Sequence, residues 1–235
     1  MSGTTNLLLE NLNALAGGLF LLAAFGMVAM RQARGCLHLF ITQSLLLAAS
    51  ALLLGLRHHS GHLYGVAIVN VITKPFIVPW LLRRTSPEEI YTRREVDQVL
   101  NIPAALLIAL ALAILAYFLG LPLLNAVAPD YRSPNVPIGI AGLLLGAYTL
   151  TVRREAVPLL LGVLAMENGA FFTGISISRN LPLLVELAIA TDGLIIVFIM
   201  GVLTRAVLKH VGTTAVGELT SLREAAAEPV TEEPK

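Results

Sequence analysis

Seven long apolar segments constrain the fold of this chain more than any other feature. They lie at about residues 8–30, 36–56, 62–82, 101–121, 135–152, 157–178 and 181–208. A helix that crosses a hydrocarbon core ~30 Å thick needs about 20 apolar residues, so each segment is long enough for one crossing. The sequence therefore predicts an all-α, polytopic membrane bundle of about seven helices within residues 1–210, followed by a polar cytoplasmic tail at 211–235.

The composition leaves little room for anything besides these helices. Of the 235 residues, 56% are hydrophobic and only 13% are charged, which is far from the profile of a soluble domain. A single cysteine, Cys36, excludes a CxxC metal site and iron–sulfur ligation by this chain alone. His58, His59 and His62 lie together at one turn without an acid or a cysteine, so metal binding there is disfavoured. The formal net charge of +1 gives no indication of nucleic-acid binding.

Basic residues at the segment ends predict the orientation, because Lys and Arg are enriched on the cytoplasmic side of membrane proteins. Three of them fall on the side that would hold the N-terminus, namely Arg57, Arg132 and Arg179. Ten fall on the opposite side: Arg31, Arg34, Arg83, Arg84, Arg93, Arg94, Arg153, Arg154, Arg205 and Lys209. We therefore expect a multi-pass membrane protein with the N-terminus outside and the C-terminus in the cytoplasm.

The apolar segments contain ionisable residues, among them Lys74, Glu167, Glu186 and Asp192, in a setting where a buried charge is costly unless it is paired or hydrated. At a rise of about 1.5 Å per residue, Lys74, Glu167 and Asp192 would each lie about 15–18 Å from a segment end. Glu186 would lie only about 8 Å from the outer end of its segment. A base and two acids at one depth on three segments thus form a lateral row of charges near the midplane.

This row has two interpretations. It could be a structural network of ion pairs and hydrogen bonds that holds the helices together. It could also be a proton relay, which requires buried titratable groups linked through polar side chains or water. We favour the relay, because ionisable residues inside a membrane are functional by default. Other polar residues of the segments would either bridge the charged groups or bond neighbouring helices: Gln43, Asn70, Asn168 and Thr191.

Prolines and glycines predict two local features of the bundle. Pro75 and Pro79 each remove a backbone hydrogen bond, so the helix around Lys74 should be kinked or locally opened. The ammonium of Lys74 or a water molecule could then satisfy the freed carbonyls, although a simple packing kink is an equal alternative. Gly139, Gly142 and Gly146 should allow close approach of helices rather than bind a ligand.

A weak internal repeat is also visible. When segments one to three are laid on segments five to seven, Thr73-Lys74 falls on Thr191-Asp192, and Gln43 lies near the counterpart of Glu167. One extra segment separates the two triplets, so the copies would share one orientation. We interpret the pattern as a parallel three-helix repeat.

Several polar motifs carry a resemblance to a known family. They are Ile72-Thr73-Lys74, Met166-Glu167-Asn168-Gly169, Val185 to Asp192, and the tail from Gly212-Thr213 to Leu219-Thr220. Together they resemble component E of hydrogenase-4, a membrane subunit of group 4 [NiFe]-hydrogenase and formate hydrogenlyase complexes, over essentially the whole chain. Segments five to seven also resemble the K subunit (chain 4L) of NADH:quinone oxidoreductase. The second-helix glutamate of chain 4L would fall near Leu164 and its third-helix acid near Asp192.

The resemblance implies a non-catalytic membrane subunit, with the metal and iron–sulfur centres on partner subunits and no cofactor on this chain. Its partners would be antiporter-like and anchor membrane subunits. The row of Lys74, Glu167, Asp192 and Glu186 would extend a charged axis through the membrane and contribute to proton translocation coupled to electron transfer. The alternatives are a purely structural scaffold of the membrane arm, or an independent secondary transporter suggested by the repeat.

Overall fold

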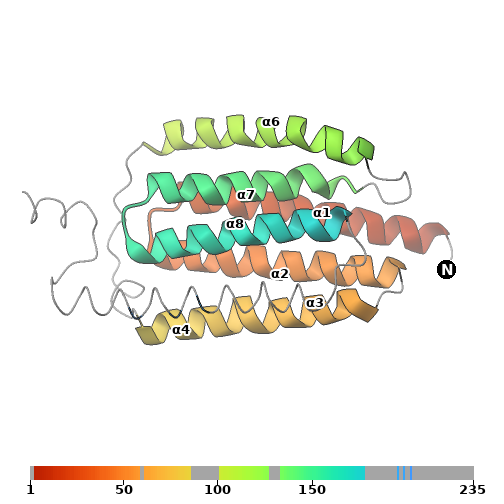
Figure 1. Ribbon diagram of the computed structural model, residues 1–235, viewed down its shortest axis with the longest axis horizontal. Coiled ribbons are helices and arrows are strands. Elements are labelled where there is room, and N and C mark those ends of the chain that lie inside the picture. Colours follow the sequence, from red (N-terminus) through yellow and green to blue (C-terminus); the bar gives the residue numbers. More distant parts are fainter. Residues whose placement is uncertain are drawn as a thin grey trace, which may run out of the picture.

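The computed structural model describes residues 3–58, 61–85, 101–126 and 133–177, together with the single helical residues Ile195, Phe198 and Val202. The helices of this part are α1 (Gly3–Ala29), α2 (Ala33–His58), α3 (Gly61–Val71), the π-helix η1 (Ile72–Ile77), α4 (Val78–Thr85), α6 (Ile102–Ala126), α7 (Asn135–Val152) and α8 (Ala156–Ile177). The described residues contain no strand. Figure 1 shows these helices lying lengthwise beside one another.

Six stretches of the described chain are long and apolar enough to cross a membrane. They are α1, α2, the continuous stretch Leu63–Arg84 formed by α3, η1 and α4, and then α6, α7 and α8. The prediction of an all-α, multi-pass membrane bundle is confirmed. The helix bounds lie close to the predicted ones, although α1 begins at Gly3 rather than near residue 8 and α6 ends at Ala126 rather than near residue 121.

The seventh predicted segment, 181–208, falls almost entirely outside the described residues, apart from three isolated positions. Glu186, Thr191 and Asp192 lie in the part that is not described, as does the tail at 211–235. The orientation in the membrane, the domain bounds and the three-helix repeat therefore stay predictions.

The bundle is organised around close contact between α7 and α8. A Cβ atom added at Gly146 would lie 2.3 Å from the Met166 backbone nitrogen, and one added at Gly169 would lie 2.0 Å from that of Leu143. Only glycine permits backbones to approach this closely. The prediction that the glycines of α7 allow close helix approach is confirmed.

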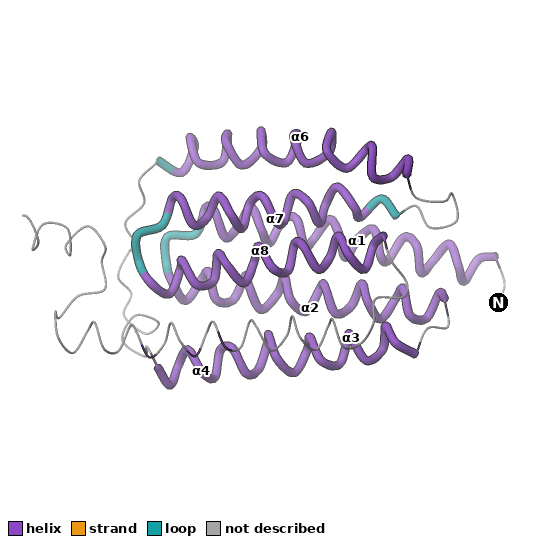
Figure 2. The backbone as a smooth tube through the Cα atoms, viewed as in Figure 1, coloured by secondary structure: helices purple, strands orange, loops and turns teal. Residues whose placement is uncertain are grey.

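The other helices surround this pair in a defined order. α1 contacts α2 and α7, α2 contacts α3 and α8, and α6 packs against α7 at one edge of the bundle. Figure 2 shows the same arrangement along the backbone. The end of the bundle at which α1, α3 and α7 begin and α2 and α8 end is called the N-terminal end below.

The interior is layered along the bundle axis. Phe20, Leu47 and Phe172 belong to an apolar layer toward the N-terminal end, and Phe40, Leu161 and Leu164 belong to another toward the opposite end. Buried polar residues of α2 and α8 occupy the level between these layers. This alternation places a polar site in the middle of the spans.

Candidate intramembrane polar site

Lys74 projects from a π-helical turn in the middle of the third span. Pro75 has no N–H to donate, so the regular α-helical ladder cannot continue through it, and η1 forms instead. In this turn the Val78 N–H donates to the carbonyl of Thr73, five residues back. The predicted local opening of the helix is confirmed. The Lys74 side chain is directed into the bundle and is 4% exposed.

The ammonium of Lys74 contacts three side chains of α8. Its Nζ lies 2.9 Å from Glu167 Oε1 in an ion pair. It also donates to Asn168 Oδ1 at 2.7 Å, and it lies 5.9 Å from the centroid of the Phe171 ring. An anion, a neutral oxygen and a ring face thus replace the water that surrounds an exposed ammonium. The described contacts of this ammonium go to a neighbouring helix rather than to the carbonyls freed by proline.

Asn168 extends the contacts to α2. Its Nδ2 donates to Ser44 Oγ at 2.9 Å and to Gln43 Oε1 at 3.4 Å. Gln43, Ser44 and Asn168 are fully buried. Gln43 Nε2 is a buried donor that has no acceptor among the described residues. We call Gln43, Ser44, Lys74, Glu167 and Asn168 the central cluster.

The central cluster lies halfway along three membrane spans. Lys74 is the twelfth residue of Leu63–Arg84, Glu167 is the twelfth of Ala156–Ile177, and Gln43 is the eleventh of Ala33–His58. At about 1.5 Å per residue, each is ~15–17 Å from the end of its span, which is half of a ~30 Å hydrocarbon core. The cluster is therefore a mid-membrane site that joins helices far apart in the sequence.

The structure brings together four of the residues singled out in the sequence, namely Gln43, Lys74, Glu167 and Asn168. Asn70 is not among them in the part of the chain that the structure describes, and its bridging role stays a prediction. Its Nδ2 donates to the carbonyl of Val66, one turn back in α3, at 3.2 Å. A short polar side chain in a helix can bond the backbone of its own preceding turn, and here this local bond prevails.

A second polar cluster, absent from the sequence predictions, lies toward the N-terminal end. Ser50 Oγ donates to Asn13 Oδ1 at 2.6 Å, and Asn135 Nδ2 donates to the backbone carbonyl of Asn13 at 3.0 Å. These three residues come from α2, α1 and α7, and all are buried. Asn135 Oδ1 accepts no hydrogen bond from the described residues. We call Asn13, Ser50 and Asn135 the terminal cluster.

A sequence signal for the terminal cluster exists on α2. Gln43, Ser50 and Arg57 recur every seven residues, which places them on one face of a helix. Arg57 Nη2 lies 3.4 Å from Glu10 Oε2 of α1, and both of these side chains are partly exposed. A polar stripe therefore runs along α2 from the central cluster to the N-terminal end.

Arg153, directly after α7, is a buried cation outside the apolar spans. Its Nη2 donates to the carbonyls of Met27 at 2.8 Å and Val28 at 3.2 Å, and also to that of Met30. These carbonyls lie at the C-terminal end of α1 and directly after it, where a cation also interacts favourably with the helix dipole. Burial lowers the pKa of Arg153 below its ordinary value. In the sequence, Arg153 is only one of the basic residues that predict the orientation of the chain in the membrane. In the structure, its hydrogen bonds connect the end of α7 to the end of α1.

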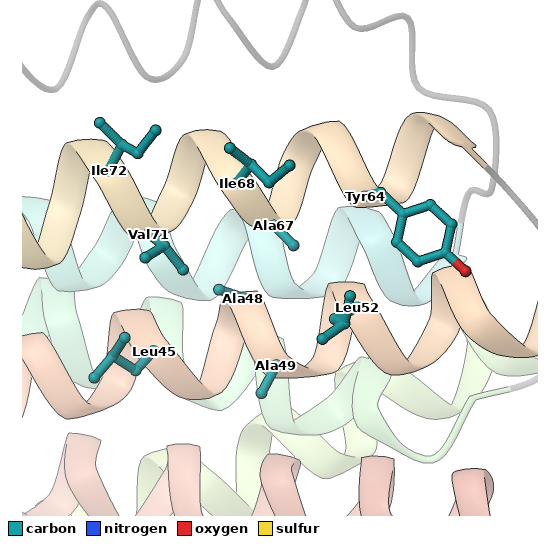
Figure 3. Close-up of a pocket in the computed structure, with 9 residues that line it drawn as sticks. All are labelled: Leu45, Ala48, Ala49, Leu52, Tyr64, Ala67, Ile68, Val71 and Ile72. Atoms are coloured by element: carbon teal, nitrogen blue, oxygen red, sulfur yellow. The ribbon is translucent and has the colours of Figure 1, made fainter.

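An apolar groove of about 450 Å³ between α2 and α3 is a separate feature (Figure 3). Its walls include Leu45, Ala48 and Leu52 of α2 and Tyr64, Ala67 and Ile68 of α3. Apart from the Tyr64 hydroxyl, these side chains offer no hydrogen-bonding group. Specific polar recognition needs several such groups, so the chemistry of the described residues concentrates in the two polar clusters.

Comparisons with known proteins show that the chain is similar to proteins of several bacteria. The uncharacterized protein Rv0085 of Mycobacterium tuberculosis is 32% identical over 209 residues, which cover 89% of this chain and 94% of that protein. Hydrogenase-4 component E of Escherichia coli K12 is 25% identical over 223 residues, covering 94% and 99% of the two chains. Hydrogenase-4 component E of Shigella flexneri matches equally well.

No family model and no solved structure matches the chain. The resemblance to hydrogenase-4 component E is thus supported as a distant homology over most of the chain, whereas the resemblance to chain 4L stays a prediction. The chain belongs to the family of the Mycobacterium tuberculosis protein Rv0085, with hydrogenase-4 component E as a distant relative.

Proposed function

We propose that this chain is a non-catalytic membrane subunit of a hydrogenase-type respiratory complex. Two findings support the proposal: the distant homology to hydrogenase-4 component E over most of the chain, and the six apolar helices long enough to span a membrane. The proposal assigns the [NiFe] and iron–sulfur centres to partner subunits. It assigns antiporter-like and anchor subunits to the neighbourhood of this chain in the membrane.

The central cluster supports a role in proton translocation. Removing two charges from water costs several kcal/mol per ion, which their mutual attraction offsets only in part. An ion pair in the middle of a bilayer is therefore a poor stabilising device, and such residues commonly mark ion or proton pathways. The pair formed by Lys74 and Glu167, with its link through Asn168 to α2, is the observation that carries the proposal.

The two side chains of the ion pair differ in how far they are exposed at the surface of the bundle. The Lys74 side chain is 4% exposed, whereas that of Glu167 is 18% exposed at the same depth. Part of the Glu167 side chain thus reaches the surface of the described bundle, while its Oε1 is buried beside Lys74. A polar group of a neighbouring subunit next to this side chain can continue the charged axis. In the proposed orientation the N-terminus faces the outside of a prokaryotic inner membrane, and Asp192 and Glu186 add further charges to the axis.

The proposal is tested in the assembled complex in inverted membrane vesicles. Glu167→Gln keeps the size and the hydrogen-bonding capacity of the side chain but removes its titration. We expect this variant to assemble and to transfer electrons, while vesicle acidification per H₂ turned over falls. Glu10→Gln is the matched control, because Glu10 is 43% exposed and lies at the N-terminal end. Unchanged acidification per H₂ in the Glu167→Gln complex would contradict the relay.

A structural scaffold is the second candidate, because the central cluster joins α2, α8 and the third span. It predicts that Glu167→Gln lowers the amount of complex that copurifies with the chain, while each complex that forms translocates protons normally. A third candidate, an independent secondary transporter, depends on the predicted repeat. It predicts proton-coupled uptake by the purified chain alone in liposomes.

A further inference from the structure

We infer that a water-accessible branch leads from the N-terminal end of the bundle through the terminal cluster to the central cluster, and that the stacked rings of Phe20 and Phe172 close it. The inference rests on the proposed function, since the branch would exchange protons with the pair of Lys74 and Glu167. It adds a route along the membrane normal to the lateral axis.

Each cluster contains a buried polar atom that a water molecule would satisfy by a hydrogen bond. Gln43 Nε2 in the central cluster and Asn135 Oδ1 in the terminal cluster have no hydrogen-bond partner among the described residues. Both residues are fully buried. A buried donor or acceptor left without a partner destabilises the folded state, and in native proteins ordered water commonly satisfies such groups. One free donor and one free acceptor thus define two hydration sites.

The two clusters are close enough for a short chain of water molecules. Ser44 and Ser50 lie six positions apart on α2, an axial distance of about 9 Å at 1.5 Å per residue. With oxygen–oxygen distances of about 2.8 Å, two or so waters can bridge this interval. The side chains that now fill it decide whether such a chain can form.

An apolar plug fills the interval. The rings of Phe20 in α1 and Phe172 in α8 stack with centroids 4.5 Å apart at an interplanar angle of 18°. Leu47 belongs to the same apolar layer and lies three residues from both Ser44 and Ser50. All three side chains are fully buried. Hydrophobic constrictions of this kind gate pores by excluding water, so the described conformation corresponds to a closed branch.

The polar stripe of α2 shows at which end the branch opens. Arg57 lies seven residues beyond Ser50, and its partner Glu10 lies three residues before Asn13. The side chains of Arg57 and Glu10 are 32% and 43% exposed. Charged and partly exposed groups thus lie next to the terminal cluster, at the N-terminal end.

Cysteine labelling in the full complex tests the branch. Cys36 is the only cysteine of this chain, so Cys36→Ser provides a chain without thiols, and labelling is read on this chain after it is separated from its partner subunits. Single cysteines are then placed at Ser50, Ser44 and Leu45, the last being a lipid-facing control that is 44% exposed. The reagent is a methanethiosulfonate with a permanently charged trimethylammonium group, which does not cross the membrane, and it is applied separately from each side. We expect Ser50→Cys to react from the N-terminal side, whereas Leu45→Cys does not react from either side.

Opening the plug should extend the labelling to the central cluster. With Phe172→Ala, the reaction of Ser44→Cys should accelerate by at least about tenfold, the effect of lowering an activation free energy by ~1.4 kcal/mol. Phe20→Leu keeps an apolar side chain and removes the ring stack, so it provides a second variant if Phe172→Ala fails to assemble. Equal rates with and without an altered plug, or no reaction of Ser50→Cys from the N-terminal side, would overturn the inference.

The labelling result is independent of the relay test. If the branch is present but Glu167→Gln leaves proton translocation unchanged, the proposed function fails while the water route stands. If Glu167→Gln abolishes translocation but neither cysteine becomes reactive, the route fails while the relay stands.

Discussion

Removing either charge of the central ion pair should destabilise the protein more than removing both. Lys74→Met leaves Glu167 without its cation at mid-depth, and Glu167→Met leaves the 4%-exposed ammonium without its anion. Breaking a buried pair costs about 3–5 kcal/mol. Because the Glu167 side chain is 18% exposed, we expect the lower value of about 3 kcal/mol for each single variant.

The double variant, Lys74→Met with Glu167→Met, removes both charges and leaves one hydrogen-bonding group without its partner. Asn168 Oδ1 then lacks the donor that Lys74 supplies, which costs about 1–3 kcal/mol. The two single effects would sum to about 6 kcal/mol, so the expected coupling energy is about 3–5 kcal/mol in favour of the double variant. Such non-additive effects on the free energy of unfolding are expected when each buried charge is stabilised mainly by the opposite charge of its partner.

The measurement is reversible unfolding of the purified chain in mixed micelles, followed by far-UV circular dichroism. The control cycle uses Arg57→Met and Glu10→Met, because this pair is partly exposed at a separation of 3.4 Å. Exposed pairs contribute about 0–1 kcal/mol, so the control coupling should not exceed ~1 kcal/mol. Additive effects at Lys74 and Glu167 would refute the assignment of a compensated ion pair.

Two glycine substitutions and one control test the packing around the clusters. A Cβ at Gly17 would lie 2.4 Å from Asn135 Oδ1, so Gly17→Ala should cost about 1–3 kcal/mol in the same unfolding measurement. Gly18→Ala is the matched control, because no atom lies within 4 Å of its added Cβ, and it should be neutral or stabilising by about 0.5–1 kcal/mol. Gly169→Ala would place its Cβ against the backbone of Leu143, so it should cost about 3 kcal/mol or more and reduce the folded yield after solubilisation. Wild-type yield for Gly169→Ala would contradict the close contact of α7 and α8.

The spans could be predicted because apolar length and its interruptions are local properties of the sequence. The segment at 135–152 coincides with α7, since polar and proline residues precede it and two arginines follow it. The depth of Lys74 and Glu167 follows from counting along each helix. The sequence predicts depths of about 15–18 Å for the two residues, and the spans of the structure place both at about 16 Å from a span end. Equal depth alone does not determine whether two side chains are in contact.

Which helices are neighbours, and which side chains face the interior, depend on packing between helices whose surfaces are largely apolar. Phe20 and Phe172 lie in uniformly apolar segments, so no periodic pattern distinguishes a ring in the interior from one facing lipid. Asn70 shows the same limit for a polar group, because its bond within α3 depends on a side-chain rotamer. The hydrogen bonds of Asn13 and Asn135 required the positions of three helices at once.

The separation of Lys74 from Glu167 has a consequence for biogenesis. The two residues are 167 − 74 = 93 positions apart, and a chain emerges from the ribosome with its N-terminal part first. A lysine at the centre of a helix opposes membrane insertion by about 2.5–3.5 kcal/mol. The third span must therefore enter the bilayer on the strength of its own apolar residues, while its anionic partner in α8 is still to be synthesised. Insertion of α8 then becomes the step that pairs Lys74 with Glu167, and until that step the third span holds its lysine without this anion.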